Sequence, residues 1–171
     1  MRIRLGLTVC CAALFVLSTS SQSQAFERQW HAGVDAGVAS LFGGYSAAGF
    51  GAGTHVVYGL SDTFNALLDL DFTRHPSVNT DIWSGGAGIA YTLDVARAVP
   101  YAGLLAAGYK FTGDLSTTAP GFQVVLGLDY QIDRNWAVGL EVKMHTIFAR
   151  DPIGAAAYGT TFLRFEYTWG F

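Results

Sequence analysis

The last nine residues of the chain alternate between large apolar side chains and polar or small ones. Every second position is apolar or aromatic: Leu163, Phe165, Tyr167, Trp169 and Phe171. Arg164 and Glu166 lie in the intervening phase. Successive side chains of a β-strand point to opposite faces, so this segment presents one apolar face and one polar face. That combination is typical of a strand in a transmembrane β-barrel, which meets lipid outside and polar groups inside.

The N-terminal segment has the features of a secretory signal peptide. Two arginines precede an apolar stretch over residues 5–17, and small residues precede Phe26. The apolar core is shorter than the roughly 18 residues that a spanning helix needs, which disfavours an uncleaved anchor. We therefore expect a cleaved signal over residues 1–25 and a single mature domain over residues 26–171.

The composition of the mature chain excludes several classes of function. Loss of the signal lowers the number of basic residues from ten to eight, against 13 acidic ones, which gives a net charge of −5. This balance provides no basic surface for nucleic acid. Both cysteines lie in the signal, so disulfides and cysteine-ligated metals are excluded from the mature protein.

The hydrophobic residues of the mature chain alternate with polar or small ones and do not form long apolar runs. The sequence is 51% hydrophobic and 13% charged, yet beyond the signal no unbroken apolar run is long enough for a membrane helix. Eight alternating segments have about the length that a tilted strand needs to cross a bilayer. They are residues 30–38, 47–58, 64–73, 82–93, 99–111, 122–132, 136–146 and 162–171.

These segments predict an all-β fold, an eight-stranded antiparallel up-and-down transmembrane β-barrel. A secreted soluble β-sandwich is the alternative, but it would not need outward faces this apolar. Segments 82–93 and 99–111 are so rich in Gly and Ala that the pattern leaves their faces open. We place Lys110 inward because lipid disfavours a charge.

The connections between these segments differ in length and indicate two ends of the barrel. Turn-forming residues at 61–62, 94–98 and 133–135 predict tight turns on the periplasmic side. The other connections should face outside, and His75 belongs to one of them. The longest, residues 112–121, is expected to be a loop of about ten residues.

Charged residues are expected to fill the lumen, which in an eight-stranded barrel is just wide enough for side chains. Those predicted to point inward near mid-membrane are Asp35, Asp69, Asp71, Glu141, Lys143 and Arg164. Buried opposite charges should compensate one another. We interpret them as a structural network that closes the lumen, and the alternative is a narrow path for ions, protons or small solutes.

The histidines are the remaining candidates for site chemistry. His31 and His55 are predicted to point inward on paired strands, where they could form a zinc site with Asp35 or Asp129. No short ligand motif supports such a site. Hydrogen-bonded lumen histidines are therefore the preferred interpretation, and we expect no metal and no other cofactor.

The chain resembles the small eight-stranded outer-membrane barrels related to the transmembrane domain of outer-membrane protein A, OmpX, Ail and the opacity proteins. The resemblance covers the mature chain and rests on residues 165–171, Pro100 to Gly103, and the Gly-alternating segments 49–53 and 85–88. It implies the outer membrane of a Gram-negative bacterium, with its lipids and lipopolysaccharide as surroundings. We expect a monomer that is not anchored to the cell wall.

The same resemblance implies a role for the C-terminal aromatic residues and a role in the cell envelope. Barrel-assembly machinery recognises a terminal strand of this kind, here marked by Phe165, Tyr167, Trp169 and Phe171. Structural or surface-contact roles are implied, but the short outer connections weigh against an adhesin that needs long loops. Arg74, His75 and Arg150 at the outer rim either pair with lipid phosphates or provide ordinary solubility.

Catalysis is the third interpretation, because some barrels of this size are lipid A deacylases with a His and a Ser two residues apart on the penultimate strand. In this chain Ile147 stands two residues after His145, in place of that serine, and Thr146 lies on the opposite face. No Ser-His-Asp grouping stands out elsewhere. We therefore expect no enzymatic activity.

Overall fold

A computed structural model gives the structure of the protein. It describes residues 27–42, 47–93, 97–113, 116–148 and 157–170. The expected signal over residues 1–25, the rim residue Arg150 and the terminal Phe171 lie outside these ranges. Arg28 and Gly170 are therefore close to the two ends of the described chain.

Eight antiparallel strands form a closed barrel in which each strand pairs with the next and β1 pairs with β8. The strands are β1 (Trp30–Phe42), β2 (Ala47–Gly59), β3 (Phe64–His75), β4 (Thr80–Thr92), β5 (Ala98–Gly113), β6 (Thr117–Gln131), β7 (Trp136–Ile147) and β8 (Ala157–Trp169). The predicted up-and-down barrel is confirmed, and the soluble sandwich is excluded. Closure leaves no strand edge with unpaired backbone groups in lipid.

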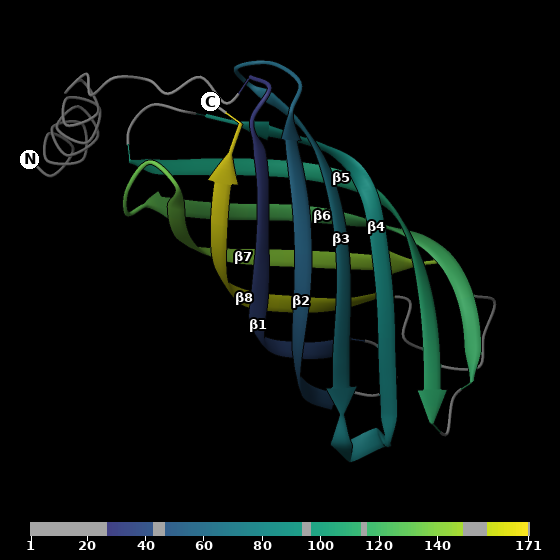
Figure 1. Ribbon diagram of the computed structural model, residues 1–171. Helices are drawn as coiled ribbons and strands as arrows, with labels where there is room; N and C mark the ends of the chain where they lie inside the picture. Colours follow the sequence, from purple (N-terminus) through teal and green to yellow (C-terminus); the bar gives the residue numbers. More distant parts are fainter. Residues whose placement is uncertain (1–26, 43–46, 94–96, 114–115, 149–156, 171) are drawn as a thin grey trace, which may run out of the picture.

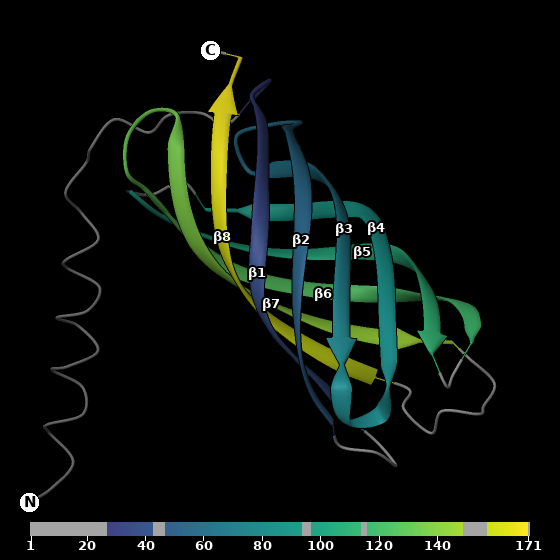
Figure 2. The ribbon, with the colours of Figure 1, turned by 60° about the horizontal axis from the view of Figure 1, so that its bottom comes forward.

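The strands are strongly tilted relative to the barrel axis. In Figure 1, β2, β3 and β4 run from top to bottom at the front, while β5, β6 and β7 cross behind them almost horizontally. Figure 2 shows the same crossing after rotation. Tilt of this kind accompanies the staggered register that a sheet needs to close on itself.

The two ends of the barrel differ in their connections. The turn end carries the tight connections after β2 and β6 and both ends of the described chain, as Figure 1 shows. The loop end carries a short 3-10 helix, η2 (Pro76–Val78), between β3 and β4. From the signal peptide we expect the turn end to face the periplasm.

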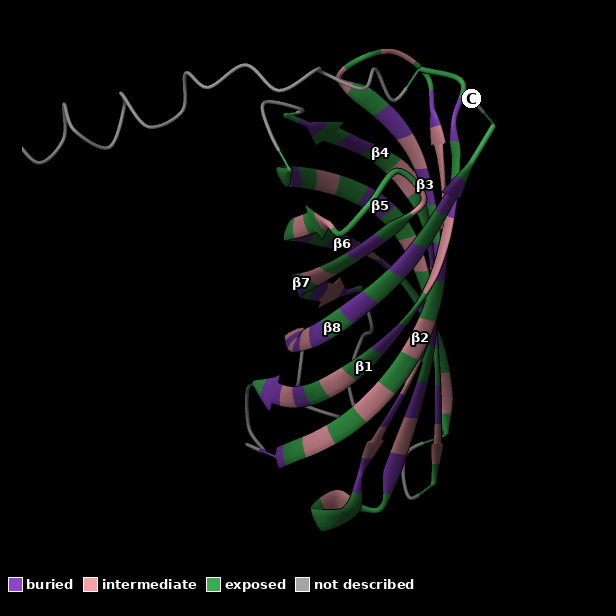
Figure 3. Ribbon diagram, turned by 60° about the vertical axis from the view of Figure 1, so that its left-hand side comes forward, coloured by how far each residue is buried: buried purple, intermediate pink, exposed green. Residues whose placement is uncertain are grey.

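Buried and exposed residues alternate along the strands, which Figure 3 shows as coloured bands. The outward phase predicted for the clear strands is exposed, with Leu70 at 65% and Leu163 at 69%. The inward phase is buried, as the sequence predicted for β3, β7 and β8. One face of the sheet therefore meets hydrocarbon, and the other fills the lumen.

The structure settles the faces of β4 and β5 and corrects the position of Lys110. Tyr101, Leu105, Tyr109 and Phe111 are buried inward, so Lys110 lies in the opposite phase and is exposed. The inward prediction for Lys110 was wrong because the aromatic residues on either side of it fix the alternation. Lys110 lies near the end of β5, where a long side chain can extend its ammonium toward the membrane surface.

Two predicted connections are shorter than expected. Residues 112–121 do not form a long loop, because β5 continues to Gly113 and β6 begins at Thr117. The β-branched threonines and the inward packing of Phe111 and Ala119 extend this hairpin. His75 is not in a loop either, since it is the last residue of β3 and is fully buried.

Within the described part of the chain, no helix is long and apolar enough to cross a membrane.

A charge on the lipid face should destabilise the barrel according to its depth. Leu70→Arg, at the middle of β3, is expected to lower the free energy of unfolding in vesicles by about 2–4 kcal/mol. Phe64→Arg, at the end of the same strand, should cost about 0–1 kcal/mol. Urea titration of protein folded in lipid vesicles measures both. Equal losses at the two positions would contradict a bilayer midplane near Leu70.

Candidate functional site

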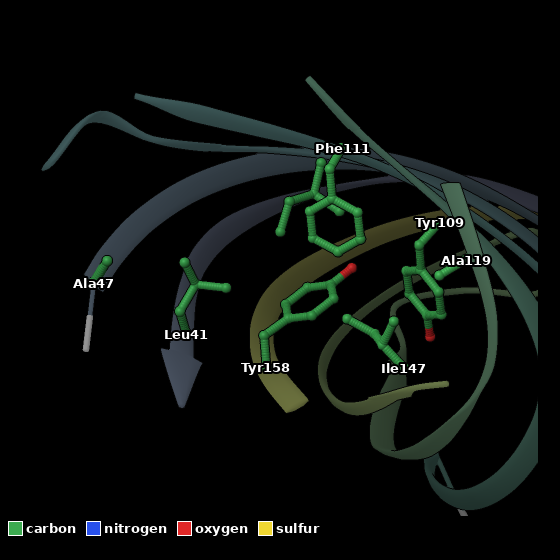
Figure 4. Packing of buried hydrophobic residues seen from close by; sticks show 8 residues of the cluster. Leu41, Ala47, Tyr109, Phe111, Ala119, Ile147 and Tyr158 are labelled. Atoms are coloured by element: carbon green, nitrogen blue, oxygen red, sulfur yellow. The ribbon is translucent and has the colours of Figure 1, made fainter. Parts of the chain in front are cut away.

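An apolar cluster lies at the loop end of the lumen. Its buried members, most of which are labelled in Figure 4, come from seven of the eight strands: Leu41, Ala47, Ile82, Tyr109, Phe111, Ala119, Ile147 and Tyr158. The Tyr158 ring stacks on His145 with centroids 3.9 Å apart. The Tyr158 hydroxyl donates to Ser84 Oγ at 3.3 Å. We call this group the apolar plug.

Below the apolar plug, the ammonium of Lys143 is surrounded by carboxylates. Lys143 Nζ lies 2.8 Å from an oxygen of Asp69, 2.8 Å from one of Asp71 and 3.3 Å from one of Glu141. Its side chain is 1% exposed. Phe162 lies beside this group, with Lys143 Nζ 5.8 Å from the ring centroid. The ion group thus links β3 and β7 across the lumen.

Arg164 of β8 forms a second ion group nearer the turn end. Its guanidinium lies 3.1 Å from Glu141, 3.1 Å from Glu166 and 3.5 Å from Asp35. It also donates to the hydroxyl of Tyr101, which in turn donates to Glu141 at 2.9 Å. Because Glu141 contacts both cations, the two ion groups form one lumen charge network.

The space for Tyr101 is provided by a glycine on the neighbouring strand. A Cβ at Gly127 would overlap the Tyr101 ring, so only glycine allows the phenol to cross to Arg164 and Glu141. The ring also lies 5.0 Å from the guanidinium carbon of Arg164. Gly127 therefore permits a contact that no side chain at that position would tolerate.

His31 and His55 join the same network through hydrogen bonds. His55 Nδ1 lies 2.9 Å from Asp35, and its Nε2 lies 3.0 Å from Glu166. His31 Nδ1 lies 2.8 Å from the second oxygen of Glu166. Among the residues that the structure describes, no group of three His, Cys, Asp or Glu side chains has the arrangement of a metal site.

The six charged residues predicted for the lumen are all brought together in this network: Asp35, Asp69, Asp71, Glu141, Lys143 and Arg164. The sequence interpretation left Glu166 and Tyr101 out, although both lie in the inward phase of their strands. Asp129, considered only as a metal ligand, lies 3.8 Å from Arg164. Among the described residues, six acidic side chains thus lie around Lys143 and Arg164 in the lumen.

A cavity of about 50 Å³ opens below the charge network at the turn end. Leu67, Val99 and Ala137 form part of its wall, and Asn65, Asp129 and Arg164 supply polar groups. The lumen therefore has three layers: the apolar plug, the lumen charge network and this turn-end cavity.

The C-terminal aromatic residues form a packed band on the lipid face. Phe165, Tyr167 and Trp169 point outward and are 44%, 40% and 39% exposed. Trp136 of β7 stacks on Phe165 with centroids 4.8 Å apart and contacts Tyr167 at 4.7 Å. Aromatic girdles of this kind lie at membrane interfaces. Their recognition by assembly machinery stays a prediction.

His145, the histidine weighed for hydrolytic chemistry, lies in a buried aromatic environment. It is fully buried beside the apolar plug, stacked on Tyr158, with Thr160 Oγ1 at 3.4 Å from its Nε2. Its Nδ1 lies 3.3 Å from the Tyr109 hydroxyl. Ile147 is also buried inward, at the position where the deacylase pattern has a serine.

Comparison with known proteins identifies the family. A family profile described as "Outer membrane protein beta-barrel domain" matches residues 9–171. The chain belongs to this family. As a member of the outer membrane protein beta-barrel family, it is an integral protein of the Gram-negative outer membrane, in agreement with the resemblance seen in the sequence. No curated protein sequence matches the chain.

Solved structures share the fold of this family member at low sequence identity. Neisserial surface protein A is 20% identical with a TM-score of 0.73, over 81% of this chain and 96% of that one. Ail of Yersinia pestis is 12% identical with a TM-score of 0.60, over 84% and 99%. OprG of Pseudomonas aeruginosa is 12% identical with a TM-score of 0.57, over 85% and 97%.

Removal of the Lys143 charge should destabilise the barrel. Lys143→Met leaves three buried carboxylates without their shared cation and is expected to lower the free energy of unfolding by about 3–5 kcal/mol. Adding Asp69→Asn and Asp71→Asn to the same chain should recover part of this loss. Urea unfolding in vesicles measures both chains. A loss below about 1 kcal/mol in the single variant would contradict a cation-dependent network.

Proposed function

We propose that the protein is a closed, non-catalytic outer-membrane barrel with a structural or surface-contact role. The observation that carries this proposal is the lumen charge network, in which Lys143 and Arg164 connect inward carboxylates from several strands. The apolar plug adds a second closure at the loop end. A lumen filled in this way favours rigidity over transport.

The proposed surroundings are outer-membrane lipids and lipopolysaccharide, with the barrel as a monomer inserted by the assembly machinery. The exposed apolar belt and the aromatic band of β7 and β8 support insertion in lipid. At the loop end, Arg74 binds Asp81 at 2.7 Å and Asn79 at 3.0 Å. These partners favour ordinary rim solubility for Arg74 over a dedicated lipid phosphate site.

A narrow path for ions or small solutes is the second candidate. The excess of carboxylates over cations and the turn-end cavity favour it. Such a path would have to pass both the lumen charge network and the apolar plug. Closure by paired side chains therefore remains the proposed state.

Conductance in planar lipid bilayers separates the two candidates. The folded protein is expected to be silent, because buried ion pairs and the apolar plug block hydrated ions. Stepwise currents that disappear in Asp69→Ala but persist in the lipid-face variant Leu70→Ala would overturn the closed barrel in favour of the path.

The absence of catalysis is tested with lipid substrates. Ail and the outer membrane enzyme PagL both share the fold of this chain, so the fold alone does not decide. We expect lipopolysaccharide incubated with the purified barrel to keep its acyl chains, as read by mass spectrometry. Loss of an acyl chain that is abolished by His145→Ala would instead establish an enzyme.

A further inference from the structure

His55 lies between two carboxyl groups of the lumen charge network. Its Nδ1 is 2.9 Å from an oxygen of Asp35 on β1, and its Nε2 is 3.0 Å from an oxygen of Glu166 on β8. The side chain of His55 is 2% exposed, and those of Asp35 and Glu166 are 0% and 7% exposed. Solvent is therefore largely excluded from both contacts.

This arrangement needs a proton that a neutral histidine does not have. An ionised carboxylate only accepts hydrogen bonds, and a neutral imidazole has one N–H and one acceptor nitrogen. A neutral ring could donate to one carboxylate, but its other nitrogen would then direct a lone pair at the second carboxylate. With one added proton, both ring nitrogens donate, and both contacts become charge-assisted hydrogen bonds.

The surrounding contacts indicate that the ring carries this proton and that the two acids are ionised. Glu166 accepts a hydrogen bond from Arg164 at 3.1 Å, and its second oxygen lies 2.8 Å from His31 Nδ1. Asp35 lies 3.5 Å from the guanidinium of Arg164. Hydrogen bonds and a nearby cation both stabilise the ionised form of a carboxyl group.

The backbone places the ring across three adjacent strands where the barrel closes. Gly33 of β1 pairs in register with His55 of β2 on one side and with Glu166 of β8 on the other. A Cβ at Gly33 would overlap the imidazole ring, so this glycine lets the ring cross β1 and reach β8. His55 thus connects β2 to both strands of the β1–β8 seam.

We propose that His55 is an imidazolium in the folded barrel and forms a proton-dependent clamp between β1, β2 and β8. The inference goes beyond the proposed structural role, since it makes the stability of the seam sensitive to pH. Arg164 opposes a positive ring, whereas the four acids around it favour one. The charged and titratable groups around the ring come from β1 (His31 and Asp35), β3 (Asp69), β6 (Asp129) and β8 (Arg164 and Glu166).

Ring-nitrogen NMR at pH 8 tests the charge state directly. An ordinary histidine has a pKa of about 6.5 and is largely neutral at this pH. In histidine-labelled barrel folded in micelles, His55 is expected to show two protonated ring nitrogens, and its signals are assigned by their loss in His55→Gln. His145 is the internal control and should show one, because its nitrogens face the hydroxyls of Tyr109 and Thr160. An unprotonated nitrogen on His55 would overturn the proposal.

Two variants separate the clamp from a general effect of lumen charge. Asp35→Asn replaces an acceptor with an amide that can donate to Nδ1, so His55 should become neutral at pH 8. Asp129→Asn removes one charge from the same lumen, but both ring nitrogens of His55 contact other residues, so His55 should stay protonated. A dispersed amide spectrum verifies that each variant is folded. A protonated ring in Asp35→Asn, or a neutral ring in Asp129→Asn, would contradict the clamp.

The clamp also predicts how the stability of the barrel changes with pH. Its contribution is complete below about pH 6.5 and declines above it, because the unfolded chain then releases the His55 proton while the folded barrel keeps it. Relative to His55→Gln, which does not titrate, the unaltered barrel should lose up to about tenfold in its folding equilibrium constant per pH unit between pH 7 and pH 9. Urea unfolding in vesicles measures both chains at each pH. A difference that stays constant or grows with pH would refute the clamp.

Discussion

Closure of the sheet between β1 and β8 is the constraint on which the rest of this structure depends. Lipid offers no hydrogen bonds, so every backbone group at membrane depth must pair within the barrel. Closure with eight strands fixes a narrow lumen, and a narrow lumen brings inward side chains from opposite walls into contact. The ion pairs of Lys143 on β7 with Asp69 and Asp71 on β3 are therefore consequences of strand number as much as of residue choice.

Glycine on one strand and a long polar side chain on another allow this lumen to be filled closely. Tyr101 reaches Arg164 and Glu141 because Gly127 has no side chain in its way. Asp71 similarly lies against Gly53. Inward glycines on one strand thus leave room for larger inward side chains on the adjacent strand.

The fold could be predicted from the sequence because alternation with a period of two assigns the residues of a strand to two opposite faces. Charged residues such as Glu141 and Arg164 then identify which face points inward. Where Gly and Ala replace large residues, in β4 and β5, the phase was not readable, and Lys110 was misplaced by its charge. The partners of Arg164 were only partly predictable: Glu166 lies two residues along the same strand, but the approach of Tyr101 and Asp129 depends on the register between strands distant in sequence.

The order of charges along the chain has a consequence for assembly. Asp35, Asp69 and Asp71 belong to the first three strands, whereas Lys143 and Arg164 belong to the last two. A half-built sheet would hold its acids before either cation arrived, and like charges would repel within it. Only the last two strands bring Lys143 and Arg164 to these acids, so partly formed barrels without β7 and β8 keep this repulsion and are disfavoured.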